Sequence, residues 1–308
     1  MMLDSPRILE FAAQSDCAGL SVSLVVVTGV SGASVRNPGA LMAVAEDGRF
    51  AGSLSGGCIE QVVVGEARWA IADRRARKLI YGAGSPIIDI RLPCGGTVEL
   101  LASAPLPAGL AGEMLARLKA RREVVIAFPP DAPPALVERG QTGWDGERFL
   151  ARCPPPLRIV AIGHGGTIEA LALLAAAVGA GFEAVTLDAE IARRLEAERI
   201  PVQRLYSQGE PAGLHGDGWT AFAVFFHDHD WEAALLEEAL AQPSFYVGVM
   251  GSRATHAARL AALGIRGVGT ADQARIVSPI GVIASSRDPE TLALSTLAQI
   301  VAAYNAAA

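Results

Sequence analysis

The chain has 308 residues, of which 51% are hydrophobic and 19% charged, and its formal net charge is -6 at pH 7. This composition excludes disorder of the whole chain, because the apolar content is high enough to offset chain entropy. The length favours two domains, at about 150 residues each. A mildly acidic chain without a long basic cluster also makes nucleic acid an unexpected partner.

The cysteines and the hydropathy pattern bear on the cellular compartment. No two of the four cysteines form a CxxC pair, so neither a structural zinc site nor a secreted disulfide framework is indicated. The apolar run 170–182 is shorter than the roughly 18 residues of a membrane span. Asp4 and Glu10 lie where a signal peptide would be basic and then apolar. We therefore expect a cytoplasmic protein without a membrane partner or a targeting segment.

Proline predicts where the domains divide. Nine of the 18 prolines fall between residues 104 and 156, where their fixed φ and missing N–H group interrupt regular structure. We therefore predict a first domain over 1–104, a proline-rich connection over 105–156 and a second domain over 157–308. Within the connection, the pattern predicts one helix over 109–121 and one strand over 124–128.

The first domain is predicted to be an α+β module. Its strands are expected at 22–27, 40–45, 49–53, 78–81, 87–92 and 97–103. One helix is expected to begin at Ser5, and apolar residues at helical spacing predict a second over 58–73.

Strands and helices alternate in the second domain. The strands are expected at 158–162, 184–187, 221–226 and 245–249, and the helices at 167–178, 189–199, 230–240 and 252–263. This alternation predicts a Rossmann-like, doubly wound parallel sheet. Ligands of such sheets bind outside the carboxyl ends of the strands.

The first turn of the second domain has glycines at the positions that a dinucleotide-binding turn requires. Gly163 and Gly165 lie in the run GHGG between a strand and a helix, where they permit a tight turn and the approach of a pyrophosphate. Asp188 ends the next strand at a spacing suited to a ribose hydroxyl. However, Ile168 replaces the third glycine of the fingerprint. Binding of NAD or another adenine nucleotide and a purely structural turn therefore both stay open.

Two more motifs follow strands of the second domain. His227 and Asp228 belong to the run HDHD, which suits a metal or acid–base cluster, but a turn with an Asp helix cap explains the same residues. Ser252 and Arg253 begin a predicted helix after the strand 245–249. Ser252 is expected to cap this helix, and its first N–H groups together with the Arg253 guanidinium suit an anion.

Two cysteines of the first domain lie beside paired glycines. Gly56 and Gly57 precede Cys58 at the predicted start of a helix, where the macrodipole and free N–H groups favour a thiolate. Cys94 is followed by Gly95 and another glycine. Thiolates in glycine loops suit a soft metal or a sulfur-transfer step. The alternative is that each cysteine is a small buried hydrophobic residue.

Five long runs occur in order along the chain. They are TGVSGASVRNPGALMAVAEDGRFAGSLSGGCIE (28–60), LPCGGTVELL (92–101), FFHDHD (225–230), YVGVMGSR (246–253) and SPIGVIASSRDPETLALSTLAQIVA (278–302). Together they resemble the XdhC/CoxI family, the accessory proteins of xanthine dehydrogenase and related molybdenum hydroxylases. The resemblance implies an N-terminal XdhC/CoxI domain followed by a Rossmann domain.

The resemblance also implies a function and partners. Such a protein binds molybdenum cofactor, supports the exchange of a terminal oxo ligand for sulfido, and passes the cofactor to an apo-hydroxylase of the xanthine dehydrogenase type. A cysteine desulfurase donates the sulfur in these systems. The resemblance therefore favours a chaperone over a catalyst, and a homodimer is an open possibility.

The motifs assign roles by resemblance. Cys58 matches the family's SGGC cysteine and is expected to contact the molybdenum, and Cys94 matches the CGG cysteine. Arg36 matches the arginine before the Pro-Gly-Ala element and is expected to bind the cofactor phosphate, as a guanidinium can with two parallel hydrogen bonds. The family's usual Rossmann turn, GAGHVG, is GHGGTI here, and this difference bears on nucleotide binding.

Two other classes of function stay open. The Rossmann half, with His227 and His229 as proton donors, suits an NAD-dependent oxidoreductase, although that class leaves the thiol loops of the first half unexplained. A structural adaptor would dock onto a hydroxylase without touching its cofactor.

Overall fold

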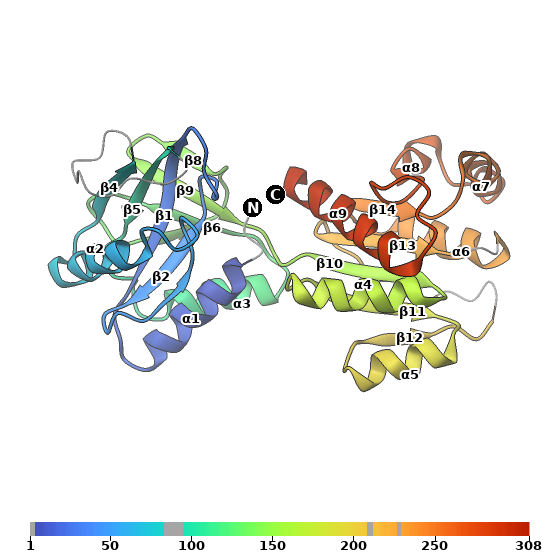
Figure 1. Cartoon of the computed structure of the whole chain (residues 1–308), viewed down its shortest axis with the longest axis horizontal. Coiled ribbons are helices and arrows are strands. Elements are labelled where there is room, and N and C mark those ends of the chain that lie inside the picture. Colours follow the sequence, from blue (N-terminus) through green and yellow to red (C-terminus); the bar gives the residue numbers. More distant parts are fainter. Residues whose placement is uncertain (1–3, 83–94, 208–211, 227–228, 308) are drawn as a thin grey trace. The chain divides into compact units, whose positions relative to one another are not determined.

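The computed structural model describes residues 4–82, 95–207, 212–226 and 229–307 (Figure 1). Contacts between residues divide this chain into two compact units that meet between Pro155 and Pro156. Each unit has its own sheets and core, as an independent domain does.

Unit 1 contains a five-stranded antiparallel sheet in the order β3-β2-β1-β5-β4. Its strands are β1 (Val22–Ser31), β2 (Leu41–Ala45), β3 (Phe50–Gly52), β4 (Arg77–Gly82) and β5 (Thr97–Ala102). Successive side chains of a strand point to opposite faces, so Leu24 and Val26 of β1 lie in one core whereas Val25 and Val27 lie in another. Both faces of the sheet are covered, which explains the nearly continuous apolar sequence of β1.

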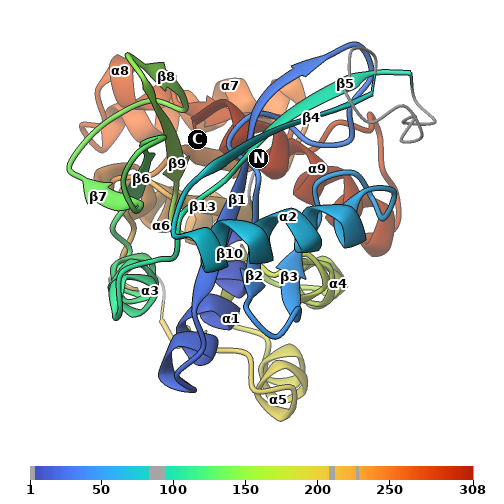
Figure 2. The ribbon, with the colours of Figure 1, turned by 90° about the vertical axis from the view of Figure 1, so that its left-hand side faces the viewer.

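Two helices cover the two faces of this sheet. On one face, α2 (Glu60–Asp73) packs Val63 and Ala67 against Val25, and Figure 2 shows this helix lying across the strands. On the other face, α1 (Ser5–Cys17) packs Leu9 against Leu24.

The segment 105–156 contains more regular structure than its prolines suggested. It forms α3 (Leu110–Lys119), β6 (Val124–Phe128), β7 (Ala135–Val137), β8 (Gly143–Asp145) and β9 (Arg148–Cys153). The strands pair as an antiparallel sheet in the order β7-β6-β9-β8. Met114, Phe128 and Phe149 share a core with Leu9 of α1, so this segment packs within unit 1. The prolines lie in the loops between these short elements, where they interrupt no hydrogen bond of the sheet.

Unit 2 contains a parallel sheet in the order β12-β11-β10-β13-β14-β15. Its strands are β10 (Arg158–Gly163), β11 (Gly181–Thr186), β12 (Val202–Arg204), β13 (Thr220–Phe225), β14 (Tyr246–Val249) and β15 (Ile276–Val277). Its helices are α4 (Gly166–Ala177), α5 (Ala189–Ala197), α6 (His229–Ala241), α7 (Arg253–Ile265), α8 (Thr270–Gln273) and α9 (Pro289–Ala307). The strand order reverses between β10 and β13, as in a doubly wound Rossmann sheet. The predicted fold class is therefore confirmed in both halves.

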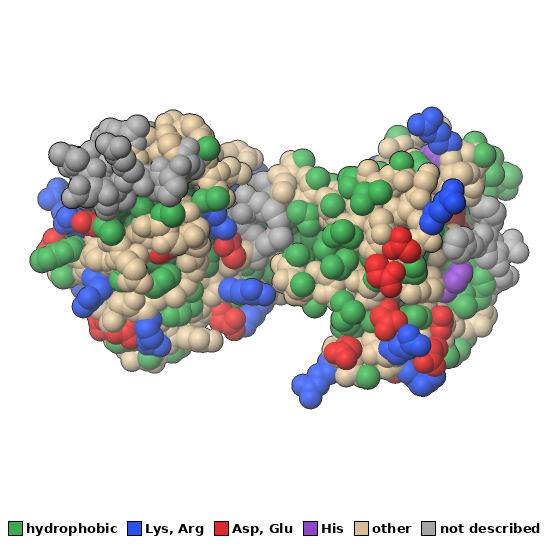
Figure 3. Space-filling model, in the orientation of Figure 1, with side chains coloured by type: hydrophobic (Ala, Val, Ile, Leu, Met, Phe, Trp, Pro, Cys, Tyr) green, Lys and Arg blue, Asp and Glu red, His purple; other side chains and the backbone are tan. Residues whose placement is uncertain are grey.

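Apolar side chains also reach the surface of unit 2. Helices α4 and α9 lie side by side, and Figure 3 shows apolar side chains on this face. Leu173 is 57% exposed and Leu294 is 53% exposed. Among the described residues, no helix combines the length and the apolarity that crossing a membrane requires.

Candidate functional site

Three glycine segments meet at one end of the antiparallel sheet of unit 1. A Cβ atom built at Gly96 would lie 2.2 Å from the carbonyl oxygen of Ala33, and one built at Gly82 would lie 2.1 Å from the carbonyl oxygen of Gly96. The backbones therefore touch without room for side chains between them. Cys94 lies outside the described residues, so the structure describes the Cys-Gly-Gly motif only from Gly95 onward. Gly95 has a φ of 70°. The structure thus brings the CGG motif against the loop that leads to Arg36.

The Cys58 loop borders open space. Gly56 and Gly57 have φ values of 78° and 111°, which L side chains rarely adopt. In the part of the chain that the structure describes, no atom beyond the chain neighbours lies within 4 Å of a Cβ built at either glycine, and Cys58 itself is exposed. The alternative of a small buried hydrophobic residue is therefore wrong for Cys58.

The predicted helix start at Cys58 is also wrong. Helix α2 begins at Glu60, with Ile59 as the N-cap residue, so the thiol precedes the helix by two residues. The N–H group of Cys58 donates to Ser55 Oγ at 3.0 Å, and that of Ile59 donates to the same oxygen at 3.1 Å. These N–H groups are bound within the loop and are not free to stabilise a thiolate.

Sequence reasoning missed Glu60, which organises this loop. Its side chain is buried, with the residue only 5% exposed, and it accepts hydrogen bonds from Ser53, Leu54 and Ser55. Burial alone would raise the pKa of this carboxyl, but the hydrogen bonds outweigh burial and lower the pKa to about 2. The available signal was an acidic residue near the predicted helix start, with serines at positions 53 and 55, but this spacing is not that of a capping box.

Arg36 already has an anionic partner. Its Nη2 lies 2.7 Å from Asp4 Oδ2, and the two side chains are 23% and 33% exposed. Ser34 Oγ donates to the carbonyl oxygen of Arg36 at 2.8 Å and holds the loop locally. A phosphate bound by this guanidinium would therefore compete with the Asp4 carboxylate.

In unit 2, the β10–α4 turn has the glycine geometry of a tight strand-to-helix connection. Gly163 has a φ of 144°, and a Cβ there would lie 2.6 Å from the carbonyl oxygen of Phe225. Gly165 has a φ of 89°. Among the described residues, no atom beyond the chain neighbours lies within 4 Å of a Cβ built there, and no side chain caps the N-terminus of α4. Ile168 is fully buried, so its bulk lies in the core and not over the open turn.

Asp188 has a local structural role at the carboxyl end of β11. It is the N-cap of α5, and its Oδ1 accepts hydrogen bonds from the N–H groups of Glu190 and Ile191 at 2.9 and 3.1 Å. If this carboxylate bound a ribose hydroxyl, it would do so while also accepting the hydrogen bonds that cap α5.

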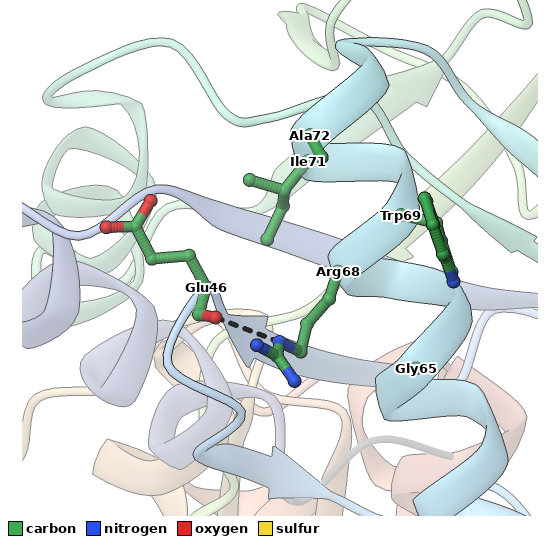
Figure 4. Close-up of a pocket in the computed structure, with 6 residues that line it drawn as sticks. All are labelled: Glu46, Gly65, Arg68, Trp69, Ile71 and Ala72. Atoms are coloured by element: carbon green, nitrogen blue, oxygen red, sulfur yellow. Dashed lines mark hydrogen bonds between the residues drawn. The ribbon is translucent and has the colours of Figure 1, made fainter.

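Ser252 and Arg253 border a cavity after β14. Ser252 Oγ accepts from the N–H group of Thr255 at 3.1 Å, which confirms the predicted N-cap role. The cavity has a volume of about 590 Å³, and its walls include Met250, Ser252, Arg253 and residues 279–286. A second pocket of about 470 Å³ lies beside α2, where Arg68 Nε donates to the carbonyl oxygen of Glu46 (Figure 4). None of the predicted site residues lines that second pocket.

The predicted His227–Asp228 cluster lies outside the described residues. Within the described ranges, no group of three His, Cys, Asp or Glu side chains is arranged to hold a metal ion.

The fold and these loops define a two-unit protein that joins an antiparallel unit with an exposed thiol loop to a Rossmann unit. Residues 17–82 match the XdhC and CoxI family, and residues 159–300 match the XdhC Rossmann domain. The chain is 33% identical over 299 residues to the molybdenum cofactor insertion chaperone PaoD of Escherichia coli (strain K12), covering 96% of this chain and 88% of PaoD. This protein therefore belongs to the XdhC and CoxI family.

A solved structure shares the whole fold. A crystal structure described as a xanthine dehydrogenase from Bacillus halodurans matches with a TM-score of 0.74 and 19% identity, over 97% of this chain and 96% of that one. At this identity the likeness concerns the fold alone.

Proposed function

We propose that this protein binds molybdenum cofactor and inserts it into a molybdoenzyme. The relative PaoD is named for this activity. The observation that supports the proposal best is the exposed Cys58 thiol on a glycine loop beside open space. A large cofactor can approach such a loop and also leave it again, as a delivery protein requires.

The chemistry of unit 1 fits this cargo. A cysteine thiolate is a soft ligand suited to a metal already bound by sulfur, and we assign Cys58 to the molybdenum end. Gly56, Gly57 and Gly95 leave the backbone open around the two thiol motifs, and Cys94 is proposed as a second thiol contact. Arg36 would bind the phosphate of the cofactor once its guanidinium separates from Asp4.

The proposal extends to the sulfuration of the cofactor and to named classes of partner. A xanthine dehydrogenase-type hydroxylase would receive the cofactor, and a cysteine desulfurase would supply sulfur for the exchange of an oxo ligand. In this scheme the chain hosts the cofactor while its partner donates the sulfur atom.

We also propose that the Rossmann unit binds an adenine nucleotide. Gly163 and Gly165 would face the pyrophosphate at the uncapped start of α4. Asp188 would accept from the ribose hydroxyls and disfavour a 2′-phosphate, and Ser252 with Arg253 would contact an anionic group. His227 and Asp228, which follow β13 in the sequence, are proposed to border this site. Calorimetric titration should show NAD binding more tightly than NADP, and the reverse order would exclude the assignment of Asp188.

The test of the main proposal is the retention of molybdenum by purified protein. We expect molybdenum and pterin fluorescence to copurify with the wild-type protein, and Cys58→Ala should lose both, since the ligand atom is removed from an exposed position. Cys17→Ala is the matched control, because Cys17 is also an exposed thiol of unit 1. If Cys58→Ala retains as much molybdenum as Cys17→Ala does, the assignment of Cys58 is wrong.

A further inference from the structure

We propose that Glu60 is the positioning residue that holds the Cys58 loop in the shape that receives the cofactor. This inference rests on the proposed function, because it assumes that the cargo is bound at Cys58. It adds a residue that makes no contact with the cargo and acts through the hydrogen bonds of the loop.

Both oxygens of the Glu60 carboxylate are used. Oε1 accepts from Ser53 Oγ at 2.8 Å and from the N–H groups of Leu54 and Ser55, each at 2.9 Å. Oε2 accepts from Ser55 Oγ at 2.7 Å and from the N–H group of Ile59 at 3.2 Å. The residues on both sides of Cys58 are therefore bonded to one side chain.

A second layer of bonds transmits this arrangement to Cys58. Ser55 Oγ donates its proton to Glu60 and, in turn, accepts from the N–H group of Cys58 at 3.0 Å. Ser53 Oγ likewise donates to Glu60 and accepts from the N–H group of Gly56 at 3.0 Å. The backbone of the loop thus folds inward around the carboxylate, and the left-handed glycines turn the exposed thiol outward.

Only a carboxylate of this length satisfies every donor. A glutamine would keep one acceptor oxygen but would place an NH₂ group where Ser55 and Ile59 now donate, so donors would face donors. An aspartate side chain is shorter by one methylene group, so its oxygens would lie farther from these donors. Buried donors that lose their acceptor are costly, so the loop would rearrange. The lost acceptor is the oxygen bonded to the Ser55 hydroxyl, and this hydroxyl binds the N–H group of Cys58.

The core of unit 1 does not depend on these bonds. Helix α2 is held to the sheet by Val63, Ala67 and Ala70, which Glu60→Gln leaves unchanged. A purely structural role for Glu60 would lower the thermal midpoint and leave the affinity of the folded protein for its cargo unchanged. A positioning role changes the affinity and the environment of the thiol.

The test compares Glu60→Gln with Glu66→Gln, the same substitution on the same helix. Glu66 pairs with Arg77 Nε at 2.8 Å, and within the described ranges no hydrogen bond or ion pair joins its side chain to the Cys58 loop. The first readout is the molybdenum bound per folded protein, and Glu60→Gln should bind the cofactor about tenfold more weakly, as expected when a group that supports a metal ligand is removed. The second readout needs no cofactor and is the alkylation rate of Cys58 relative to Cys17, measured by peptide mass spectrometry. This ratio should shift in Glu60→Gln and stay at the wild-type value in Glu66→Gln.

The outcomes separate the two proposals. If Cys58→Ala loses molybdenum but folded Glu60→Gln matches Glu66→Gln in both readouts, Glu60 has no positioning role. If Cys58→Ala keeps its molybdenum while the alkylation ratio still shifts in Glu60→Gln, Glu60 positions the loop but the assignment of Cys58 fails. If Glu60→Gln does not fold, Ser55→Ala replaces it, because this change removes the hydroxyl that joins Glu60 to the N–H groups of Cys58 and Ile59 and keeps the Glu60 carboxylate with its remaining donors. An unchanged ratio and affinity in Ser55→Ala would then overturn the proposal.

Discussion

The ion pair between Arg36 and Asp4 allows the proposed contact between Arg36 and the cofactor phosphate to be tested with single substitutions. Because the two side chains are in contact, Asp4→Asn should leave the guanidinium available and tighten cofactor binding several-fold. Arg36→Lys should weaken binding, since an ammonium group does not reproduce the planar fork of a guanidinium. Titration of cofactor into the apo protein measures both effects. Identical dissociation constants for the wild type and both variants would exclude a phosphate contact at Arg36.

Single residues also show where sequence reasoning stopped. The exposed thiol at Cys58 lies on a loop that the paired glycines made predictable. The role of Glu60 was not predictable in the same way, because it depends on bonds to residues five to seven positions earlier in the chain. Such bonds form only once the loop has folded back onto the helix start, and no periodic pattern in the sequence represents them.

At the scale of elements, the β10–α4 turn should tolerate the two glycine substitutions unequally. Gly163→Ala adds a Cβ 2.6 Å from the backbone of Phe225, so overpacking adds to the strain of a positive φ and the loss should be about 3 kcal/mol. Gly165→Ala meets no described atom within 4 Å beyond its chain neighbours, so only the strain of a backbone conformation almost confined to glycine (φ 89°, ψ 169°) applies, which should cost about 2 kcal/mol. Urea unfolding of both variants measures the difference. Equal midpoints would contradict this account of the turn.

Most of the long elements were predictable and the shortest ones were not, but the longest helix, α9, was not among the predicted helices. The apolar strands β10 and β13, together with the helices beside them, repeat a pattern over enough residues to be recognised. Strand β15 has two residues and helix α8 has four, which is too short for any period. In 105–156, proline spacing indicated interruption, but strands of three residues such as β7 fit between the prolines.

At the scale of the whole molecule, the two units divide the proposed functions. Unit 1 includes Cys58 and Arg36, which are proposed to hold the cargo, and Glu60, which is proposed to position the Cys58 loop. Unit 2 has an uncapped helix start at a glycine turn, which suits a nucleotide. The relatives match across both halves, and PaoD aligns over 96% of the chain. Tests of the proposed activity should therefore use the full chain.

Insertion of the cofactor can be measured as the transfer of molybdenum from this protein to a hydroxylase. The full-length protein, loaded with molybdenum cofactor, would be mixed with a cofactor-free molybdenum hydroxylase and the two proteins then separated by size. We predict that molybdenum leaves this protein and appears in the hydroxylase, whose activity rises above the level that the same amount of free cofactor restores. Cys58→Ala, treated in the same way, should deliver no more than free cofactor does. A loaded wild-type protein that kept its molybdenum, or that restored no more activity than free cofactor, would not be an insertion chaperone.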